Sequence, residues 1–118
     1  MSDSIETQAI EATRRGRVHV VRVQGRLDGT TAPMLMERCT QLLNKSGFLV
    51  LDLSRVAFLG SSGVGTLLVL SEQVQEQGGA MRLAALSEAA SSVAGLLELK
   101  DLFPIDATVE DAVFALRK

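Results

Sequence analysis

The sequence predicts an α/β fold in which a mainly parallel β-sheet of about five strands packs with four α-helices, the first strand being antiparallel at the edge. Apolar runs of strand length alternate with amphipathic runs of helix length, in the order ββαβαβαβα, which is typical of parallel sheets. The run Phe48–Leu53 is almost continuously apolar, which indicates a strand buried on both faces. Hydrophobic residues make up 47% of the 118 residues, which is enough for a single domain, 1–118, with its own core.

Two strands are expected before the first helix. The segment Ser4–Thr13 alternates weakly between apolar and polar residues and predicts an edge strand, after a loose terminus at residues 1–4. The tripeptide Arg14-Arg15-Gly16 indicates a turn. The valine-rich segment Arg17–Gln24 predicts a clear strand, on which His19 is expected to face solvent or a satisfied neighbour.

The first predicted helix follows a loop at residues 25–31. Thr30 or Thr31 can accept a hydrogen bond from a helix N–H group, so either residue is a candidate cap. Apolar residues then recur at helical spacing to about Lys45. Cys39 lies on the apolar side of this helix and is expected to be a small buried hydrophobe.

The centre of the chain places two adjacent hydroxyl groups between a strand and a helix. Ser61 and Ser62 follow the strand predicted at Phe48–Leu53 and precede a helix predicted at Val64–Gln77. The first turns of that helix are apolar over more than one face, so they are expected to be deeply buried. A helix start leaves backbone N–H groups unpaired and carries the positive end of the helix dipole.

The last third of the chain continues the alternation. Its predicted elements are a short strand at Ala80–Leu86, a helix at Glu88–Leu99 capped by Ser87, an edge strand at Leu102–Ile105, and a last helix that begins with the capping box Thr108-x-x-Asp111.

Composition excludes several classes of function. The formal charge of −2 and the 3% content of aromatic residues give no support for nucleic-acid binding. The single cysteine, Cys39, and the single histidine, His19, leave no pair for a disulfide or a metal site. The sequence has no signal-peptide pattern and no apolar run of membrane-spanning length, so we expect a cytoplasmic protein without membrane insertion.

The residues do not support an enzyme, and no catalytic residue is assigned. A nucleophile elbow with the pattern G-x-S-x-G needs a glycine two residues after the serine and another two residues before it. With Ser62 as the nucleophile, position 64 would have to be glycine, but it is Val64. With Ser61 as the nucleophile, position 59 would have to be glycine, but it is Leu59. No histidine follows His19 to act as a base, and no lysine follows the serines at the spacing of a phosphate-binding loop. We therefore expect no cofactor in this chain.

Two interpretations of the serine pair remain. Ser61 and Ser62 could simply cap the following helix. Alternatively, one hydroxyl group is exposed and accepts a phosphoryl group from another protein, which adds about −1.5 to −2 charges. A helix N-terminus tolerates that charge, whereas a partner protein packed on the loop would be repelled.

Four motifs make the chain resemble a STAS domain, specifically a bacterial anti-sigma factor antagonist. The motifs are Gly25-Arg-Leu-Asp28, Leu51-Asp-Leu53 with Val56-x-Phe58, Ser61-Ser62-Gly63-Val-Gly65, and Gly78-Gly79. The resemblance implies that Ser61 is the phosphoacceptor and that Asp28, Gly60, Ser62 and Gly63 belong to the partner-binding surface. The family usually has Asp immediately before the phosphoacceptor, where this chain has Gly60.

The resemblance also implies partners. The unphosphorylated protein would bind an anti-sigma factor that is also a histidine-kinase-like serine kinase, and phosphorylation of Ser61 would release it. ATP would be bound by the kinase, a phosphatase would restore the unphosphorylated form, and the chain itself would be a monomer or weak dimer. The alternative is a constitutive STAS scaffold, or a subunit of a transporter or signalling complex, that is not phosphorylated.

Overall fold

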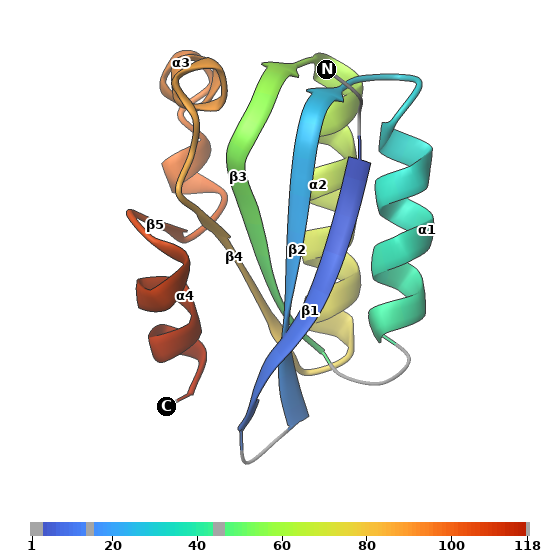
Figure 1. Cartoon of the computed structure of the whole chain (residues 1–118), viewed down its shortest axis with the longest axis vertical. Coiled ribbons are helices and arrows are strands. Elements are labelled where there is room, and N and C mark those ends of the chain that lie inside the picture. The colour runs from blue at the N-terminus through green and yellow to red at the C-terminus, as the bar shows by residue number, and fades with distance from the viewer. Residues whose placement is uncertain (1–3, 14–15, 44–46, 118) are drawn as a thin grey trace.

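The computed structural model describes residues 4–13, 16–43 and 47–117 (Figure 1). The strands are β1 (Ser4–Thr13), β2 (Gly16–Leu27), β3 (Phe48–Leu59), β4 (Ala80–Ala84) and β5 (Ile105–Asp106). The helices are α1 (Ala32–Leu43), α2 (Ser61–Glu76), α3 (Glu88–Leu96), the 3-10 helix η1 (Leu99–Asp101) and α4 (Val109–Leu116). The predicted order of strands and α-helices is therefore confirmed.

The five strands form one sheet in the order β1-β2-β3-β4-β5. β1 pairs with β2 in the antiparallel sense, and all the other pairs are parallel. This is the predicted mixed sheet with an antiparallel edge strand. Each parallel strand lies beside its predecessor; the crossovers run through α1, through α2, and through α3 followed by η1.

The larger hydrophobic core lies between one face of the sheet and the helices α1, α2 and α3. Figure 1 shows α1 and α2 side by side on this face. Cys39 of α1 is fully buried there, and desolvation raises the pKa of its thiol to about 12. The prediction that Cys39 is a buried hydrophobe is confirmed.

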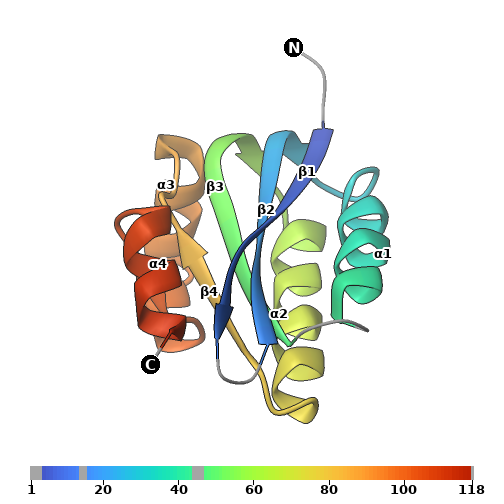
Figure 2. The same cartoon turned by 60° about the horizontal axis from the view of Figure 1, so that its bottom comes forward.

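On the other face of the sheet lies α4, on the side of β4 (Figure 2). Its apolar side packs on β2, β3 and β4 in a smaller core that consists of Val18, Val20, Phe48, Val50, Ala84, Ala112, Val113 and Leu116. Two ion pairs join neighbouring strands, Arg22–Asp52 (3.2 Å) and Arg82–Asp106 (2.6 Å). The Thr108 hydroxyl accepts a hydrogen bond from the Asp111 N–H group (3.0 Å), as the predicted cap of α4 requires.

Several predicted boundaries were wrong. β3 continues six residues beyond Leu53, because its second half keeps pairing with the end of β2 through two register shifts. α2 begins at Ser61 rather than Val64, and α3 ends at Leu96 rather than Leu99.

Smaller differences occur at other ends. β2 extends to Leu27, β4 ends at Ala84, and β5 is Ile105–Asp106 instead of Leu102–Ile105. A loose terminus was predicted for residues 1–4, but Ser4 is the first residue of β1. The other terminal residues, 1–3, lie outside the described residues, as do the turn residues Arg14 and Arg15 and the helix end at Lys45. His19 is buried on β2, so it does not face solvent.

Candidate functional site

Ser61 is the first residue of α2 and is exposed. The cap position belongs to Gly60, whose backbone is extended (φ −95°, ψ 174°) and which offers no side-chain cap. The Val64 N–H group donates to the Gly60 carbonyl oxygen (3.1 Å), as in a regular helix start. The interpretation in which Ser61 or Ser62 caps the helix is therefore wrong, and both hydroxyl groups lie at the surface.

Gly63 brings the start of α2 against the end of β2. A Cβ atom at this position would lie 2.6 Å from the Leu27 carbonyl oxygen and 3.0 Å from Leu59 Cδ1. The same Leu27 oxygen accepts a hydrogen bond from the Gly60 N–H group (2.9 Å), which fixes the serine loop to β2. Gly63 is buried, so it positions the exposed serines and offers little surface of its own.

Asp28 organises the loop between β2 and α1. One carboxylate oxygen accepts hydrogen bonds from the Thr30 (3.0 Å) and Thr31 (3.4 Å) N–H groups. The other accepts from Arg26 Nε (3.0 Å). The Arg26 guanidinium and then the Thr30 amide hold the pKa of the Asp28 carboxyl below its ordinary value, so this group is charged at neutral pH.

The predicted cap of α1 takes another role. The Thr31 hydroxyl donates to the Arg26 carbonyl oxygen (2.7 Å) and accepts from the Asp28 N–H group (3.0 Å), so it closes the loop instead of capping the helix. The Asp28 carbonyl oxygen accepts from the Ala32 N–H group (2.8 Å) at the start of α1. Asp28 and Thr31 together hold the loop in one shape.

An exposed aromatic ring lies beside this loop and was not predicted. Arg26 and Phe58 are direct neighbours in the β2–β3 register, and the Arg26 guanidinium carbon lies 4.5 Å from the centroid of the Phe58 ring. The Phe58 side chain is 43% exposed. The sequence shows Phe58 as an aromatic residue just before the serine loop. Its contact with Arg26 depends on the second half of β3, which was not predicted from the sequence.

The structure brings the predicted site residues together at the carboxyl ends of β2 and β3. A Cβ atom at Gly60 would lie 3.7 Å from Asp28 Cβ and 3.0 Å from Phe58 Cε2, and one at Gly29 would lie 3.6 Å from Ser62 Oγ. We define the serine-loop surface as Asp28, Phe58, Gly60, Ser61 and Ser62. It is a surface between two adjoining loops, with a charged carboxylate and two exposed hydroxyl groups.

The exposed side of α2 extends this surface. Ser61, Gly65, Leu68 and Glu72 follow one another at helical spacing and are all exposed. Leu68 is 36% exposed, and its neighbour Val69 is 43% exposed. The prediction that the first turns of this helix are deeply buried was therefore wrong on this side, because the sheet covers only the opposite face of α2.

Comparison with known proteins identifies the family. The STAS domain family matches residues 9–112. The chain belongs to the STAS domain family. This agrees with the five-stranded sheet and the four helices described above.

The relatives of this STAS domain include anti-sigma factor antagonists. It is 31% identical to the anti-sigma-B factor antagonist of Bacillus subtilis over 93 residues, which cover 79% of this chain and 85% of the relative. An anti-sigma factor antagonist from Mycobacterium paratuberculosis has a similar crystal structure, with a TM-score of 0.79, 34% identity and coverage of 98% and 96% of the two chains.

SpoIIAA, another anti-sigma factor antagonist, shares the fold in two states. Its unphosphorylated form has a TM-score of 0.79, 22% identity and coverage of 97% of this STAS domain and 96% of SpoIIAA. Its phosphorylated form, from Bacillus, has a TM-score of 0.68, 24% identity and coverage of 95% and 100%. Within the described part of this STAS domain, no helix is long and apolar enough to cross a bilayer.

Proposed function

We propose that this STAS domain is an anti-sigma factor antagonist that binds an anti-sigma factor when Ser61 is unphosphorylated and is released when Ser61 is phosphorylated. The observation that carries the proposal is the position of Ser61, exposed at the first turn of α2 and free of any capping role. The identity to two anti-sigma factor antagonists supports the general role. The anti-sigma factor is a histidine-kinase-like serine kinase, and a phosphatase reverses the modification.

Electrostatics favours a switch that leaves the fold intact. A phosphate adds about −1.5 to −2 charges, and at the positive end of the α2 dipole this is favourable by about 0.3–1 kcal/mol. The phosphate would stand near Asp28, whose lowered pKa keeps a second negative group at the same surface. Repulsion by the phosphate and the loss of contacts would weaken a partner that packs on this surface. A loss of roughly 3 kcal/mol in binding free energy lowers the affinity about a hundredfold.

The partner docks on the serine-loop surface and on the exposed stripe of α2. Phe58 supplies an exposed aromatic ring held by Arg26, and Leu68 and Val69 supply apolar area two turns along the helix. Aromatic and arginine side chains are enriched among the residues that contribute most to protein interfaces. The phosphorylation site thus lies inside the docking area, where a new dianion acts directly on binding.

Asp28 supplies the carboxylate that position 60 lacks. Gly60 leaves the space between Phe58 and Asp28 without a side chain, and Asp28 approaches that space from the neighbouring loop. The Asp28 carboxylate is held in one orientation by two backbone N–H groups of its own loop and by Arg26, and Asp28 Cβ lies 3.7 Å from where a Cβ atom at position 60 would be. The chain itself is expected to show no catalytic turnover.

The experiment is phosphorylation by the histidine-kinase-like anti-sigma factor of the same organism with ATP, followed by localisation of the phosphate by fragmentation mass spectrometry. We expect one phosphate on Ser61, no label on the Ser61→Ala variant, and normal label on the matched Ser62→Ala variant. No label on the wild type, together with equal partner binding by wild type and Ser61→Asp, would instead establish the constitutive STAS scaffold.

A further inference from the structure

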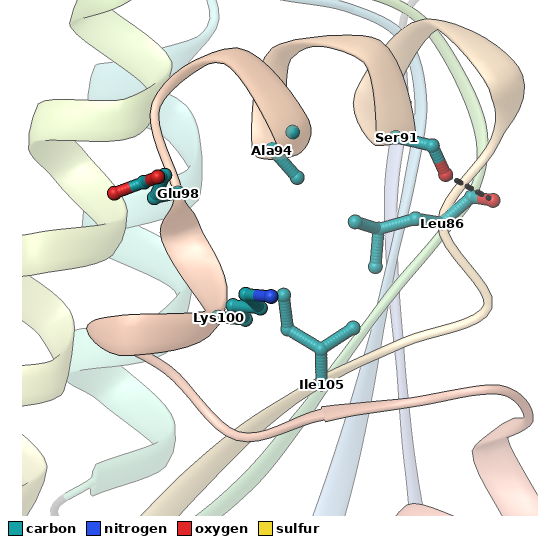
Figure 3. Close-up of a pocket in the computed structure, with 7 residues that line it drawn as sticks. Leu86, Ser91, Ala94, Glu98, Lys100 and Ile105 are labelled. Atoms are coloured by element: carbon teal, nitrogen blue, oxygen red, sulfur yellow. Dashed lines mark hydrogen bonds between the residues drawn. The ribbon is translucent and has the colours of Figure 1, made fainter.

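A cavity of about 320 Å³ lies between α3, η1, β5 and the segment after β4 (Figure 3). None of its lining residues belongs to the serine-loop surface. The volume is at the lower end of the range of small-molecule sites, about 300–1,000 Å³. The proposed function does not use this cavity.

The inner wall of the cavity is apolar. Figure 3 shows the side chains of Leu86, Ala94 and Ile105 directed into the space from three different segments. Gly95 adds free room on the α3 side, because a Cβ atom there would meet no heavy atom within 4 Å. A ligand with a hydrocarbon body would therefore bury its chain here.

Backbone conformations that L-residues rarely adopt flank the cavity. Ala85, which precedes the wall residue Leu86, has φ 55°, and Glu98, which joins α3 to η1, has φ 51°. In the part of the chain that the structure describes, these are the two non-glycine residues with positive φ. Such conformations cost free energy for a residue with a Cβ atom, and they cluster at ligand sites.

The charged groups at the rim of the cavity indicate the sign of the charge that a ligand would carry. Lys100 lies at the edge of the cavity, and among the described residues no carboxylate forms an ion pair with it. Figure 3 shows the Glu98 carboxylate directed away from the space. The Ser91 hydroxyl already donates a hydrogen bond to the Leu86 carbonyl oxygen (3.4 Å). The Lys100 ammonium is therefore the rim group available to a ligand.

We propose that this cavity binds a small monocarboxylate with an unbranched hydrocarbon chain, whose chain packs on Leu86, Ala94 and Ile105 while its carboxylate pairs with Lys100. The proposal is independent of phosphorylation at Ser61.

The test is titration of the full chain with octanoate, octanol and octylamine, which share one chain and differ in head-group charge. We expect saturable octanoate binding with a Kd below about 1 mM, within the range of good small ligands. Amide resonances of Gly95, Glu98 and Ile105 should shift. Hexanoate should bind about tenfold more weakly, because each buried methylene contributes about three- to fourfold. No saturable octanoate binding, or equal binding of octanoate and octylamine, would overturn the proposal.

Variants at two positions test separately the contact with the ligand's hydrocarbon chain and the contact with its carboxylate. Gly95→Phe fills the cavity and should weaken octanoate binding more than tenfold, whereas the matched Gly95→Ala should stay within threefold. Lys100→Gln should weaken octanoate by about twofold to fivefold and leave octanol unchanged, and Lys100→Glu should make octylamine the better ligand.

These variants also define the contradicting results. A folded Gly95→Phe protein with wild-type octanoate affinity would refute the assignment of the cavity. If Gly95→Phe does not fold, the exposed Lys100→Glu variant decides the question alone, since an unchanged preference for octanoate would equally refute the proposal. Binding of the anti-sigma factor should be the same in Lys100→Glu and the wild type.

Discussion

Replacement of Gly63 by alanine adds one methyl group at the closest approach between α2 and β2. The new Cβ atom would lie 2.6 Å from the Leu27 carbonyl oxygen and 2.8 Å from Leu27 Cγ. The oxygen belongs to the backbone of a buried strand end and cannot rotate away. Relief therefore requires a shift of α2, which also stretches the hydrogen bond from the Gly60 N–H group to the same oxygen.

The size of the effect follows from two opposing terms. Overpacking of this kind costs about 1–3 kcal/mol. Replacement of a helical glycine by alanine returns up to about 1 kcal/mol through the backbone entropy of the unfolded chain. We expect the Gly63→Ala protein to be less stable than the wild type by roughly 1–2 kcal/mol in the free energy of unfolding.

Gly65 is the matched control, two residues along the same helix. A Cβ atom there would meet no heavy atom within 4 Å, and the position is exposed. Gly65→Ala should therefore be more stable than the wild type by about 0.5–1 kcal/mol.

Urea denaturation of both variants, followed by circular dichroism, measures the difference. The expected gap between the two variants, about 1.5–3 kcal/mol, corresponds to roughly 6–12 °C in Tm for a domain of this size. The m-values should agree with that of the wild type, since the folded cores are the same. Equal stability of Gly63→Ala and Gly65→Ala would refute the close approach of α2 to Leu27.

Four further predictions concern the site and the core. Ser61→Asp should lower affinity for the anti-sigma factor by about a hundredfold while Ser61→Ala stays within a few fold, as measured by calorimetry; an equal loss in both would mean that the hydroxyl is itself a required contact. Phe58→Ala should weaken that affinity fivefold or more, about 1 kcal/mol, whereas Phe114→Ala, which removes an exposed ring on α4, should not; the same loss in both variants would place docking elsewhere. The pKa of Asp28 is lowered in the folded state, so its charge contributes stability above its unfolded pKa and the contribution is lost as the pH falls through the folded pKa. Asp28→Asn should accordingly lose more stability at neutral pH than in strong acid, and a pH-independent loss would argue against this origin. The buried Cys39 thiol, with its pKa raised to about 12, should react with iodoacetamide at neutral pH only as fast as the protein unfolds; rapid labelling of the folded protein would show that the core around α1 is open.

The order of the strands and helices and the mainly parallel sheet were predictable, because both follow from the spacing of apolar residues along the sequence. The boundaries around the serine loop were not. Ser54 and Arg55 are polar and exposed, so they look like a loop, yet β3 continues through them because the end of β2 supplies pairing partners. Only the three-dimensional register shows that these partners exist.

That the candidate site residues lie together was predictable, and the residues around them were not. Asp28 and Ser61 follow adjacent parallel strands, and the carboxyl ends of such strands meet at one edge of a sheet. The start of α2 was placed too late because Gly60 has no side chain to signal a cap. The contact between Arg26 and Phe58 depends on the extended part of β3, so it could not be inferred before that extension was known.

The spatial order of the strands repeats their order along the chain, and this has a consequence for synthesis. Each new strand joins the edge left by the one before, so the sheet can grow from one side as the polypeptide emerges from the ribosome. The part that carries the proposed switch, from β2 to the end of α2, is complete once residue 76 has emerged. The segments that enclose the cavity are synthesised later, so a truncated nascent chain should form the serine-loop surface before the cavity exists.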